Sequence, residues 1–392
     1  MRLRFPAAAA ASAVALLTLA TSAFAGSTPA PASVPADSLR ALGAREGLRI
    51  GTAIIPFDLD NAAYAQIAGQ QFSSVTAANE MNWQVVEPSP GVFDWSGGDR
   101  LVQFAEQNGQ LVRGDTLLWH NQLPAWLTTG VANGTISNDQ LREVLHQHIT
   151  TEVTHFKGKV RQWDVAAEFF ADPFDPAPPL PDGINSGDFW VQHLGEGVIA
   201  DAFRWAHEAD PDARLFYNDF NIAGEDGTNL KSDHVYAWVK QMRAAGVPIQ
   251  GVGDEAHLDT QFGFPTQMEQ DLHRFASLGV KVAIAQADVR TFVNDATQQQ
   301  PTDRLAVFAQ SDFFDQLLKA CLAERACISF TVWSFGDADS WVPGSFRGEG
   351  AATIYDVNLQ PKPQYSVLQQ DLSLADHGAP HRGDRDDAND NT

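Results

Sequence analysis

Short apolar runs alternate with longer amphipathic segments along most of the chain. Eight of the runs have the length of strands, and several of the segments between them have helical periodicity. Strands that alternate with helices indicate βαβ units and a parallel sheet, and eight such units predict a single-domain α/β fold, the (β/α)8 TIM barrel. The predicted strands are 48–54, 72–76, 111–119, 160–166, 214–218, 249–257, 280–288 and 327–334, and the clearest predicted helices are 138–158, 197–210, 229–245 and 303–325.

Both ends of the chain depart from this pattern. Residues 1–25 begin with two arginines, continue as an apolar run and end in Ala-Phe-Ala, which is typical of a secretory signal peptide. Residues 26–37 are rich in Pro, Ala and Ser and predict a flexible lead-in, while residues 374–392 predict a disordered acidic tail. The barrel is therefore expected to span residues 38–373 of a protein that is secreted to the extracellular space.

The composition fits one large domain with a neutral partner. Of the 392 residues, 44% are hydrophobic, which suffices for one large core. The net charge of −23 argues against nucleic acid, whose phosphates demand a Lys/Arg surface, and against anionic membranes. No segment after the leader is long and apolar enough for a membrane helix. We expect a monomer whose partner is a polysaccharide or oligosaccharide.

The chain has two cysteines, Cys321 and Cys327, close together in the sequence. In a secreted protein, such a pair is expected to form a disulfide that closes a small loop. A reactive or metal-binding pair is the weaker alternative, because no histidine cluster lies nearby.

Nearly every predicted strand ends in polar or aromatic residues. The carboxyl ends of barrel strands meet at one mouth, where the active sites of this fold lie. Carboxylates among Trp rings suit a carbohydrate, because sugar faces stack on indoles and a carboxyl pair cuts glycosidic bonds. No cluster has metal-ligand spacing and no Gly-rich phosphate loop is present, so neither a metal nor an organic cofactor is expected.

Single polar residues have plainer interpretations. A lone Asp at a strand end is usually a loop start or a helix cap, and this interpretation is favoured for Asp219 and Asp288 taken alone. The isolated histidines His120 and His257 fit hydrogen-bonding roles better than a zinc site. His146 and His148 lie on a helical pattern and are expected to face solvent.

Six segments carry a more specific signal. They are VTAANEMNW (75–83), RGDTLLWHNQLPAW (113–126), WDVAAE (163–168), YNDFNI (217–222), GVGDEAH (251–257) and FTVWSFGDADSW (330–341). In this order, they resemble the motifs of glycoside hydrolase family 10, the (β/α)8 endo-β-1,4-xylanases. The similarity extends from IGTAI at 50–54 to PKPQY at 361–365. The resemblance implies a barrel that hydrolyses xylan or a related β-linked glycan.

The resemblance also assigns roles to residues at the mouth. The family uses a retaining mechanism with two Glu, and its acid/base, the Glu that closes WDVVNE, corresponds to Glu168. Its nucleophile, the Glu of ITELDI, corresponds to Gln286, and an amide cannot form the glycosyl-enzyme ester. Gln286 is therefore expected to contact substrate rather than attack it. The other positions that match the family's sugar-binding residues are Asn79, Trp119, His120, Gln122, Asn218, His257, Trp333 and Trp341.

Other positions at the mouth also differ from the family. Ala78, Asn82 and Ala167 stand where the family has Glu, Lys and Asn, and Asp115 replaces a His. Glu255 replaces the family's Gln on the sixth strand, whereas the seventh strand carries Gln286, so the two residues are exchanged. An exchange keeps one carboxylate and one amide on neighbouring strands, and we expect a hydrogen bond between them. Glu255 and Asp115 therefore join Glu168 as catalytic candidates.

Three functions are compatible with this pattern. The carboxylate pair has been rearranged and the protein hydrolyses a β-glycan, or the site has decayed and binds glycan without cutting it, or the barrel serves a structural role. In the last two cases, Glu255 is a structural carboxylate paired with His257 or an Arg, and Asp115 caps a loop. We favour the rearranged enzyme, because random loss would not supply a new carboxylate on the adjacent strand.

Overall fold

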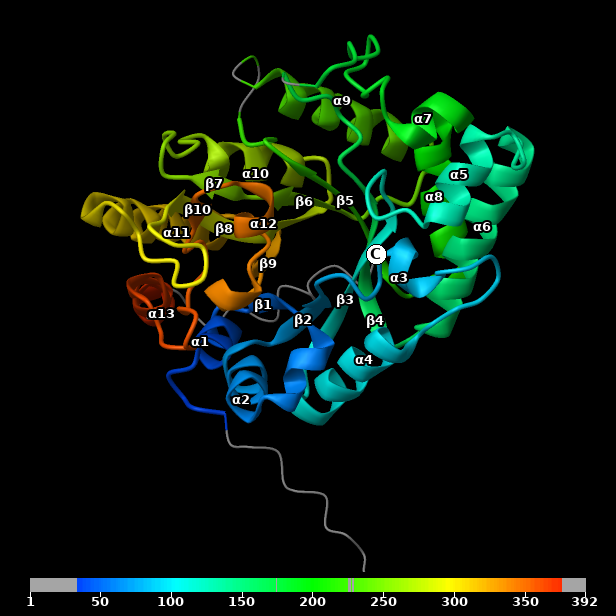
Figure 1. Cartoon of the computed structure of the whole chain (residues 1–392). Coiled ribbons are helices and arrows are strands. Elements are labelled where there is room, and N and C mark those ends of the chain that lie inside the picture. Colours follow the sequence, from blue (N-terminus) through cyan, green and yellow to red (C-terminus); the bar gives the residue numbers. More distant parts are fainter. Residues whose placement is uncertain (1–33, 174, 225–226, 228, 376–392) are drawn as a thin grey trace, which may run out of the picture. The chain divides into compact units, whose positions relative to one another are not determined.

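Eight parallel strands close into a barrel in the computed structural model, which describes residues 34–173, 175–224, 227 and 229–375. The barrel closes because β1 pairs with both β2 and β9, and β9 pairs with β8. Helices surround the strands (Figure 1), so the predicted TIM barrel is confirmed. The barrel strands are β1 (Arg49–Ile54), β2 (Ser74–Ala77), β3 (Leu111–Leu118), β4 (Val160–Ala167), β5 (Arg214–Phe220), β6 (Gly251–Glu255), β8 (Lys281–Phe292) and β9 (Cys327–Val332).

The chain's two ends lie largely outside the described residues. This applies to the predicted signal peptide, to most of the lead-in and to all but two residues of the predicted acidic tail. The described residues contain no helix long and apolar enough to cross a membrane.

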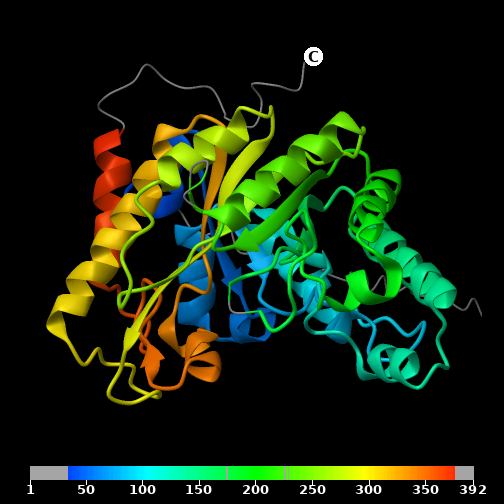
Figure 2. The same ribbon diagram turned by 90° about the horizontal axis from the view of Figure 1, so that it is seen from above.

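The helices cover the outside of the barrel with their apolar faces. In α6, Leu141, Leu145 and Ile149 recur at helical spacing and are fully buried, and a capping box of Ser137 and Gln140 fixes where the helix begins. Helices α11 and α13 lie side by side in both views (Figures 1 and 2). The helices are α1 (Leu39–Arg45), α2 (Ala62–Gln71), α3 (Trp83–Val86), α4 (Ser96–Asn108), α5 (Ala125–Ala132), α6 (Asn138–His155), α7 (Phe189–Leu194), α8 (Gly197–Ala209), α9 (Leu230–Ala244), α10 (Met268–Ala276), α11 (Arg304–Ala323), α12 (Val342–Ser345) and α13 (Pro363–Ala375), with 3-10 turns η1 (Pro56–Asp60) and η2 (Asp337–Asp339).

The expectation that His148 faces solvent was wrong. Its side chain is fully buried and stacks on Trp83, with ring centroids 3.9 Å apart. The physical reason is its position on α6, seven residues after Leu141 and therefore on the same buried face. Its ring nitrogens lie 3.6 Å from Glu87 Oε2 and 3.3 Å from Glu152 Oε2. These two carboxyl groups give the buried imidazole polar neighbours within an otherwise apolar surrounding.

Strand β8 is longer than the barrel requires. It runs for 12 residues, and its far end pairs with the short strands β7 (His257–Asp259) and β10 (Glu349–Gly350). This extension holds the loops that follow β6 and β9 against one another. It therefore positions His257 and Trp341, which come from those loops, beside the carboxyl end of the barrel.

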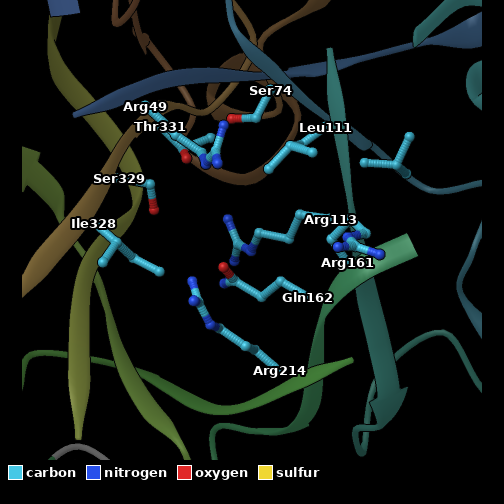
Figure 3. A pocket seen from close by; sticks show the side chains of 11 residues that line it. Arg49, Ser74, Leu111, Arg113, Arg161, Gln162, Arg214, Ile328, Ser329 and Thr331 are labelled. Atoms are coloured by element: carbon cyan, nitrogen blue, oxygen red, sulfur yellow. The ribbon is translucent and has the colours of Figure 1, made fainter. Parts of the chain in front are cut away.

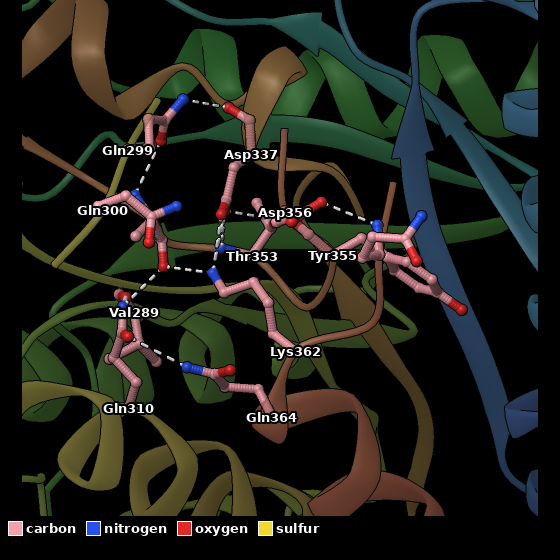
Figure 4. Close-up of polar contacts among 12 residues, drawn as sticks. Val289, Gln299, Gln300, Gln310, Asp337, Thr353, Tyr355, Asp356, Lys362 and Gln364 are labelled. Carbon is pink, nitrogen blue, oxygen red and sulfur yellow. Dashed lines mark hydrogen bonds and ion pairs between the residues drawn. The ribbon is translucent and has the colours of Figure 1, made fainter. Parts of the chain in front are cut away.

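A buried polar network ties the last segment of the chain to the loop after β9 (Figure 4). Lys362 Nζ lies 2.9 Å from Asp337 Oδ2 and donates to the carbonyl of Ala351 at 2.7 Å. Asp337 also accepts from the backbone N–H of Thr353 at 3.0 Å. Burial lowers the pKa of Lys362, while Asp337 opposes that shift. Since η2 precedes Trp341, this ion pair fixes the base of the loop that carries that indole.

The disulfide lies at the other end of the barrel. Cys321 in the last turn of α11 and Cys327, the first residue of β9, are bonded, with Cα atoms 5.3 Å apart.

Candidate active site

Four strands bring the polar residues of interest to the carboxyl end of the barrel. Asp115 comes from β3, Glu168 follows β4 directly, Glu255 ends β6, and Gln286 lies on β8. Asp115, Glu255 and Gln286 are buried, whereas 18% of the Glu168 side chain is exposed. Glu168 has a φ of 60°, a left-handed backbone that costs a non-glycine residue about 1–3 kcal/mol and occurs preferentially at active sites.

Gln286 is the centre of a hydrogen-bonded chain that crosses the barrel mouth. Its Oε1 lies 3.1 Å from His257 Nε2, and its Nε2 donates to Asp115 Oδ2 at 3.4 Å. His257 Nδ1 lies 2.8 Å from Asp288 Oδ2. Both ring nitrogens of His257 therefore face oxygen acceptors, which a doubly protonated ring satisfies. Burial alone would lower the pKa of His257, but the adjacent Asp288 raises it overall, in keeping with an imidazolium.

A bulge turns Gln286 into the mouth. The register between β8 and β9 shifts between Ile284 and Ala287, so that β8 contains one extra residue. Bulges of this kind reorient a side chain and are common beside active sites. Because of this turn, Gln286 points toward β3, on the opposite side of the barrel.

The expected hydrogen bond between Glu255 and Gln286 does not form. Asp254 is paired with Ile284, so Glu255 is level with Ala285, and Gln286 is one residue further along. The amide of Gln286 is instead used by His257 and Asp115. Glu255 also has no Lys, Arg or His within ion-pair distance in the described part of the chain, so the structural pairing with His257 or an Arg is not observed.

The carboxyl groups at the mouth hold protons more tightly than free carboxyls do. Burial raises the pKa of Glu255 well above its usual range, and the charges of Glu168 and Asp115 add to the shift. Burial also raises the pKa of Asp115 to about 7, with a contribution from Asp164 and opposition from Arg113. The pKa of Glu168 is raised mainly by burial. At neutral pH, this cluster can therefore supply both a carboxylic acid and a carboxylate, which acid–base chemistry requires.

His120 is held beside Glu168 by a residue far along the chain. His120 Nε2 lies 3.9 Å from Glu168 Oε2, and its Nδ1 lies 3.4 Å from Asp188 Oδ2. Burial alone would lower the pKa of His120, but the nearby carboxylates of Asp188 and Glu168 raise it overall. Trp119 is fixed from the same region, because its carbonyl accepts from Trp190 Nε1 at 2.8 Å.

The remaining predicted sugar-binding residues surround this centre. Gln122 donates to Asn79 Oδ1 at 3.0 Å and accepts from Asn82 Nδ2 at 3.1 Å. The three side-chain amides thus form a continuous hydrogen-bonded chain along the mouth. Trp341 donates to Asp288 Oδ2 at 2.8 Å, and its ring meets His257 edge to face, with centroids 4.8 Å apart. Trp333 is half-buried directly after β9.

The expectation that Asn218 contacts sugar needs correction. Asn218 has no exposed surface, and a β-carbon added at Gly253 would lie 2.1 Å from its Oδ1. It therefore packs in the floor beneath the site, where its carbonyl accepts from the backbone N–H of Glu168 at 3.1 Å. Its contribution is to position the acid/base candidate.

Sequence reasoning missed three supporting carboxylates. Asp288 joins His257 to Trp341, Asp188 holds His120, and Asp219 pairs with Lys231, with its Oδ1 2.8 Å from Lys231 Nζ. Asp288 could have been found, because it stands two residues after Gln286 at the second acidic position of the family's ITELDI motif. Asp188 gives no such signal, since it lies in an irregular segment before α7.

A (β/α)8 barrel with perturbed carboxylic acids among indole and amide groups at its mouth defines a glycoside hydrolase. The chain belongs to glycosyl hydrolase family 10, whose family model matches residues 38–371, and it is an endo-1,4-β-xylanase-like member of that class. It is 38% identical over 333 residues to an endo-1,4-beta-xylanase of Agaricus bisporus, an alignment that covers 84% of this chain and 93% of the relative. It is 35% identical to endo-1,4-beta-xylanase B of Thermotoga neapolitana, with 79% and 84% covered.

Solved structures agree with this assignment. The fold matches xylanase 10B from Thermotoga petrophila RKU-1 in complex with xylobiose, with a TM-score of 0.78, 34% identity and coverage of 86% of this chain and 98% of the other. Native xylanase 10B from Thermotoga maritima matches with the same TM-score of 0.78 and 34% identity, over 87% of this chain and all of that one.

Proposed function

We propose that this protein is a secreted, monomeric hydrolase of xylan or a related β-linked glycan, with Glu168 as acid/base and Glu255 in place of the family nucleophile. The observation that carries the proposal is that Glu255 is buried at the mouth without a cationic partner among the described residues. This residue ends β6, and its pKa responds to the charge of Glu168. The xylanase relatives and the xylobiose complex of the Thermotoga petrophila enzyme support xylan as the first substrate to test.

The chemistry follows from the two carboxyl groups. Glu168 in its acid form protonates the glycosidic oxygen, and the carboxylate of Glu255 attacks the anomeric carbon to form a glycosyl ester. Glu168, now a carboxylate, takes a proton from the water that hydrolyses this ester. Retention requires the two carboxyl groups to be about 5–5.5 Å apart, whereas roughly 6.5–9.5 Å would admit water and lead to inversion, with Glu255 as base.

Gln286 has a supporting role in this scheme. Its amide links His257 to Asp115 and so places a positive ring near the reacting carboxylates without supplying a nucleophile. Because burial raises the pKa of Glu255, turnover requires a pH high enough to ionise that residue. By the resemblance, Ala78 and Ala167 replace larger polar residues of the family, and this favours a decorated or differently linked sugar over plain xylan.

The test is reducing-sugar release from a panel of β-glycans and aryl glycosides by the wild type, Glu255→Gln and Asp254→Asn. Asp254 is the matched control, because it is the adjacent buried carboxyl on the same strand, with a pKa raised by burial to about 8. We expect Glu255→Gln to lower kcat by about 10⁴-fold or more, as loss of a nucleophile does, while Asp254→Asn retains activity. Unchanged turnover in Glu255→Gln would overturn the assignment, and Asp115→Asn would then be tested.

A second function, glycan binding without turnover, is favoured by one observation. The residue in the nucleophile's place is an amide held by two hydrogen bonds, an arrangement that is stable without chemistry. This function predicts xylooligosaccharide binding by calorimetry in the wild type together with no product from any substrate. Absence of both binding and turnover would leave only a structural role for the barrel.

A further inference from the structure

The turn that carries Glu168 is fixed by the neighbouring strand, β5. Glu168 comes directly after β4 and has a φ of 60°. Its backbone N–H donates to the carbonyl of Asn218 at 3.1 Å, and the N–H of Phe169 donates to the hydroxyl oxygen of Tyr217 at 3.1 Å. The first of these hydrogen bonds joins two backbones, whereas the second requires a particular side chain. The position of the turn therefore depends on the identity of residue 217.

Asp219 fixes the next residue of the turn and also holds Tyr217. Its Oδ2 accepts from the backbone N–H of Phe170 at 3.4 Å and from the hydroxyl of Tyr217 at 2.6 Å. The hydroxyl of Tyr217 thus accepts from the turn and donates to Asp219, so it links the two. The three successive N–H groups of residues 168–170 consequently have acceptors on three successive residues of β5.

Lys231 favours the form of Asp219 that this arrangement needs. Lys231 lies in the first turn of α9, its Nζ is 2.8 Å from Asp219 Oδ1, and both side chains are buried. Burial raises the pKa of Asp219, and the charge of Lys231 opposes that shift. Because an ionised carboxylate accepts hydrogen bonds at both oxygens, the lysine favours the form that accepts from Tyr217 and from the turn together.

The interior contacts of β4 hold the strand rather than the turn. Asp164, four residues before Glu168, forms a buried ion pair with Arg113 of β3. Gln162 is the register partner of Arg113, and both line a cavity of about 40 Å³ at the end where the strands begin (Figure 3). These contacts keep β4 in place, so the loss of an anchor on β5 should move the turn without moving the strand.

We propose that Tyr217 and Asp219 are positioning residues for the acid function of Glu168, a role that rests on the proposed function of this site. Both side chains are fully buried, and the ring of Tyr217 lies against Trp238 of α9, with centroids 5.2 Å apart. They therefore act through the turn and not on the sugar. A general acid must lie within hydrogen-bond reach of the glycosidic oxygen, and a displacement of about 1 Å can lower the rate roughly 10²-fold.

The dependence of hydrolysis on the leaving group tests this role. Phenyl β-xylobioside needs an acid to protonate its poor leaving group, whereas 2,4-dinitrophenyl β-xylobioside releases a stable phenolate without one. We expect Tyr217→Phe to lower kcat/KM for the phenyl glycoside at least about tenfold more than for the dinitrophenyl glycoside. A merely structural role would lower both values alike, because it would reduce the amount of folded enzyme.

Tyr64→Phe is the matched control. Tyr64 is also buried, and its hydroxyl also accepts a backbone N–H, that of Ile55, at 3.2 Å. The substitution therefore removes the same kind of hydrogen bond from the segment after β1 instead of the segment after β4. We expect Tyr64→Phe to leave the ratio of the two kcat/KM values unchanged.

Hydrogen exchange gives a readout that does not depend on turnover. In the wild type, peptides that span residues 168–170 should be as protected as those of β5, and Tyr217→Phe, unlike Tyr64→Phe, should raise their exchange rate at least about tenfold. The proposal is overturned if these amides exchange in the wild type as fast as exposed loops do, or if Tyr217→Phe leaves the leaving-group ratio unchanged. If the wild type cleaves neither glycoside, the proposed function fails, and exchange alone decides whether β5 holds the turn.

Discussion

By its resemblance to the family motif, Gln286 stands at the proposed nucleophile position, yet we expect Gln286→Glu to yield little activity at neutral pH. The amide nitrogen of Gln286 lies 3.4 Å from Asp115 Oδ2, so the substitution exchanges a hydrogen bond for two facing carboxyl groups. Two unit charges at this separation repel by about 5 kcal/mol at an effective dielectric constant of about 20. That repulsion corresponds to roughly 3–4 pKa units, added to a pKa of Asp115 already raised by burial to about 7.

The pair would therefore keep one proton at neutral pH. An acid whose pKa is higher in the folded state than in the unfolded state stabilises the fold at low pH, and that stability is lost as the pH rises through the folded pKa. Gln286→Glu should thus be less stable than the wild type at pH 8, by a few kcal/mol, and nearly as stable at pH 5. Gln84→Glu is the control, since it adds the same charge at an exposed position.

The assay is a double-mutant cycle with Asp115→Asn. Urea unfolding at pH 5 and pH 8 gives the stability of each variant, and aryl xylobioside hydrolysis gives kcat/KM. We expect the double variant to recover stability at pH 8 and to exceed Gln286→Glu in kcat/KM, because the new carboxylate can then ionise. Additive stability changes, with equal loss at pH 5 and pH 8, would show that the carboxyl groups at positions 115 and 286 do not interact.

Three further outcomes are expected. The stability of the wild type should fall between pH 4 and pH 7 because the pKa of Asp115 is raised from 3.8 to about 7 on folding. At 1.36 kcal/mol per pKa unit, this fall amounts to roughly 4 kcal/mol. Asp115→Asn should remove it, as measured by urea unfolding at several pH values. Lys362→Met should cost about 3–5 kcal/mol because it leaves buried Asp337 without its cation, and adding Asp337→Asn should recover part of the loss in the same assay. Replacing Cys321 and Cys327 by Ser should lower the free energy of unfolding by about 2 kcal/mol, since the closed loop is short, without changing kcat.

The barrel could be predicted from the sequence because its strands are buried, and buried strands consist of short runs of apolar residues. All eight predicted strands correspond to barrel strands, and the four predicted helices correspond to α6, α8, α9 and α11. The extension of β8 to Phe292, beyond the predicted end at residue 288, could not be predicted in this way. Its outer half is held by pairing with β7 and β10. Pairing with a strand far along the chain does not change the local pattern of apolar and polar residues from which strands are predicted.

The site was predictable in its residues and not in their contacts. Motif positions and the ends of the predicted strands pointed to Glu168, Glu255 and Gln286, and the structure brings all three to the carboxyl end of the barrel. The contacts depend on a bulge between Ile284 and Ala287, which arises from the register of two strands and turns Gln286 toward β3. Sequence alone therefore suggested a bond from Gln286 to its neighbour Glu255, whereas the bond crosses the barrel to Asp115.

The proposed exchange of Glu and Gln between β6 and β8 would change which residues pair with the positive charge of His257 at the mouth. His257 is bound on one side by Asp288 and on the other by the amide of Gln286, so its positive charge is matched directly by one carboxylate. Glu255 accepts no hydrogen bond from His257, and burial together with Glu168 raises its pKa. A carboxylate with fewer donors is more basic and, once ionised, more nucleophilic. In the proposed mechanism, Glu255 therefore ionises less readily than a hydrogen-bonded carboxyl does, and we expect the reaction to run in a correspondingly higher pH range.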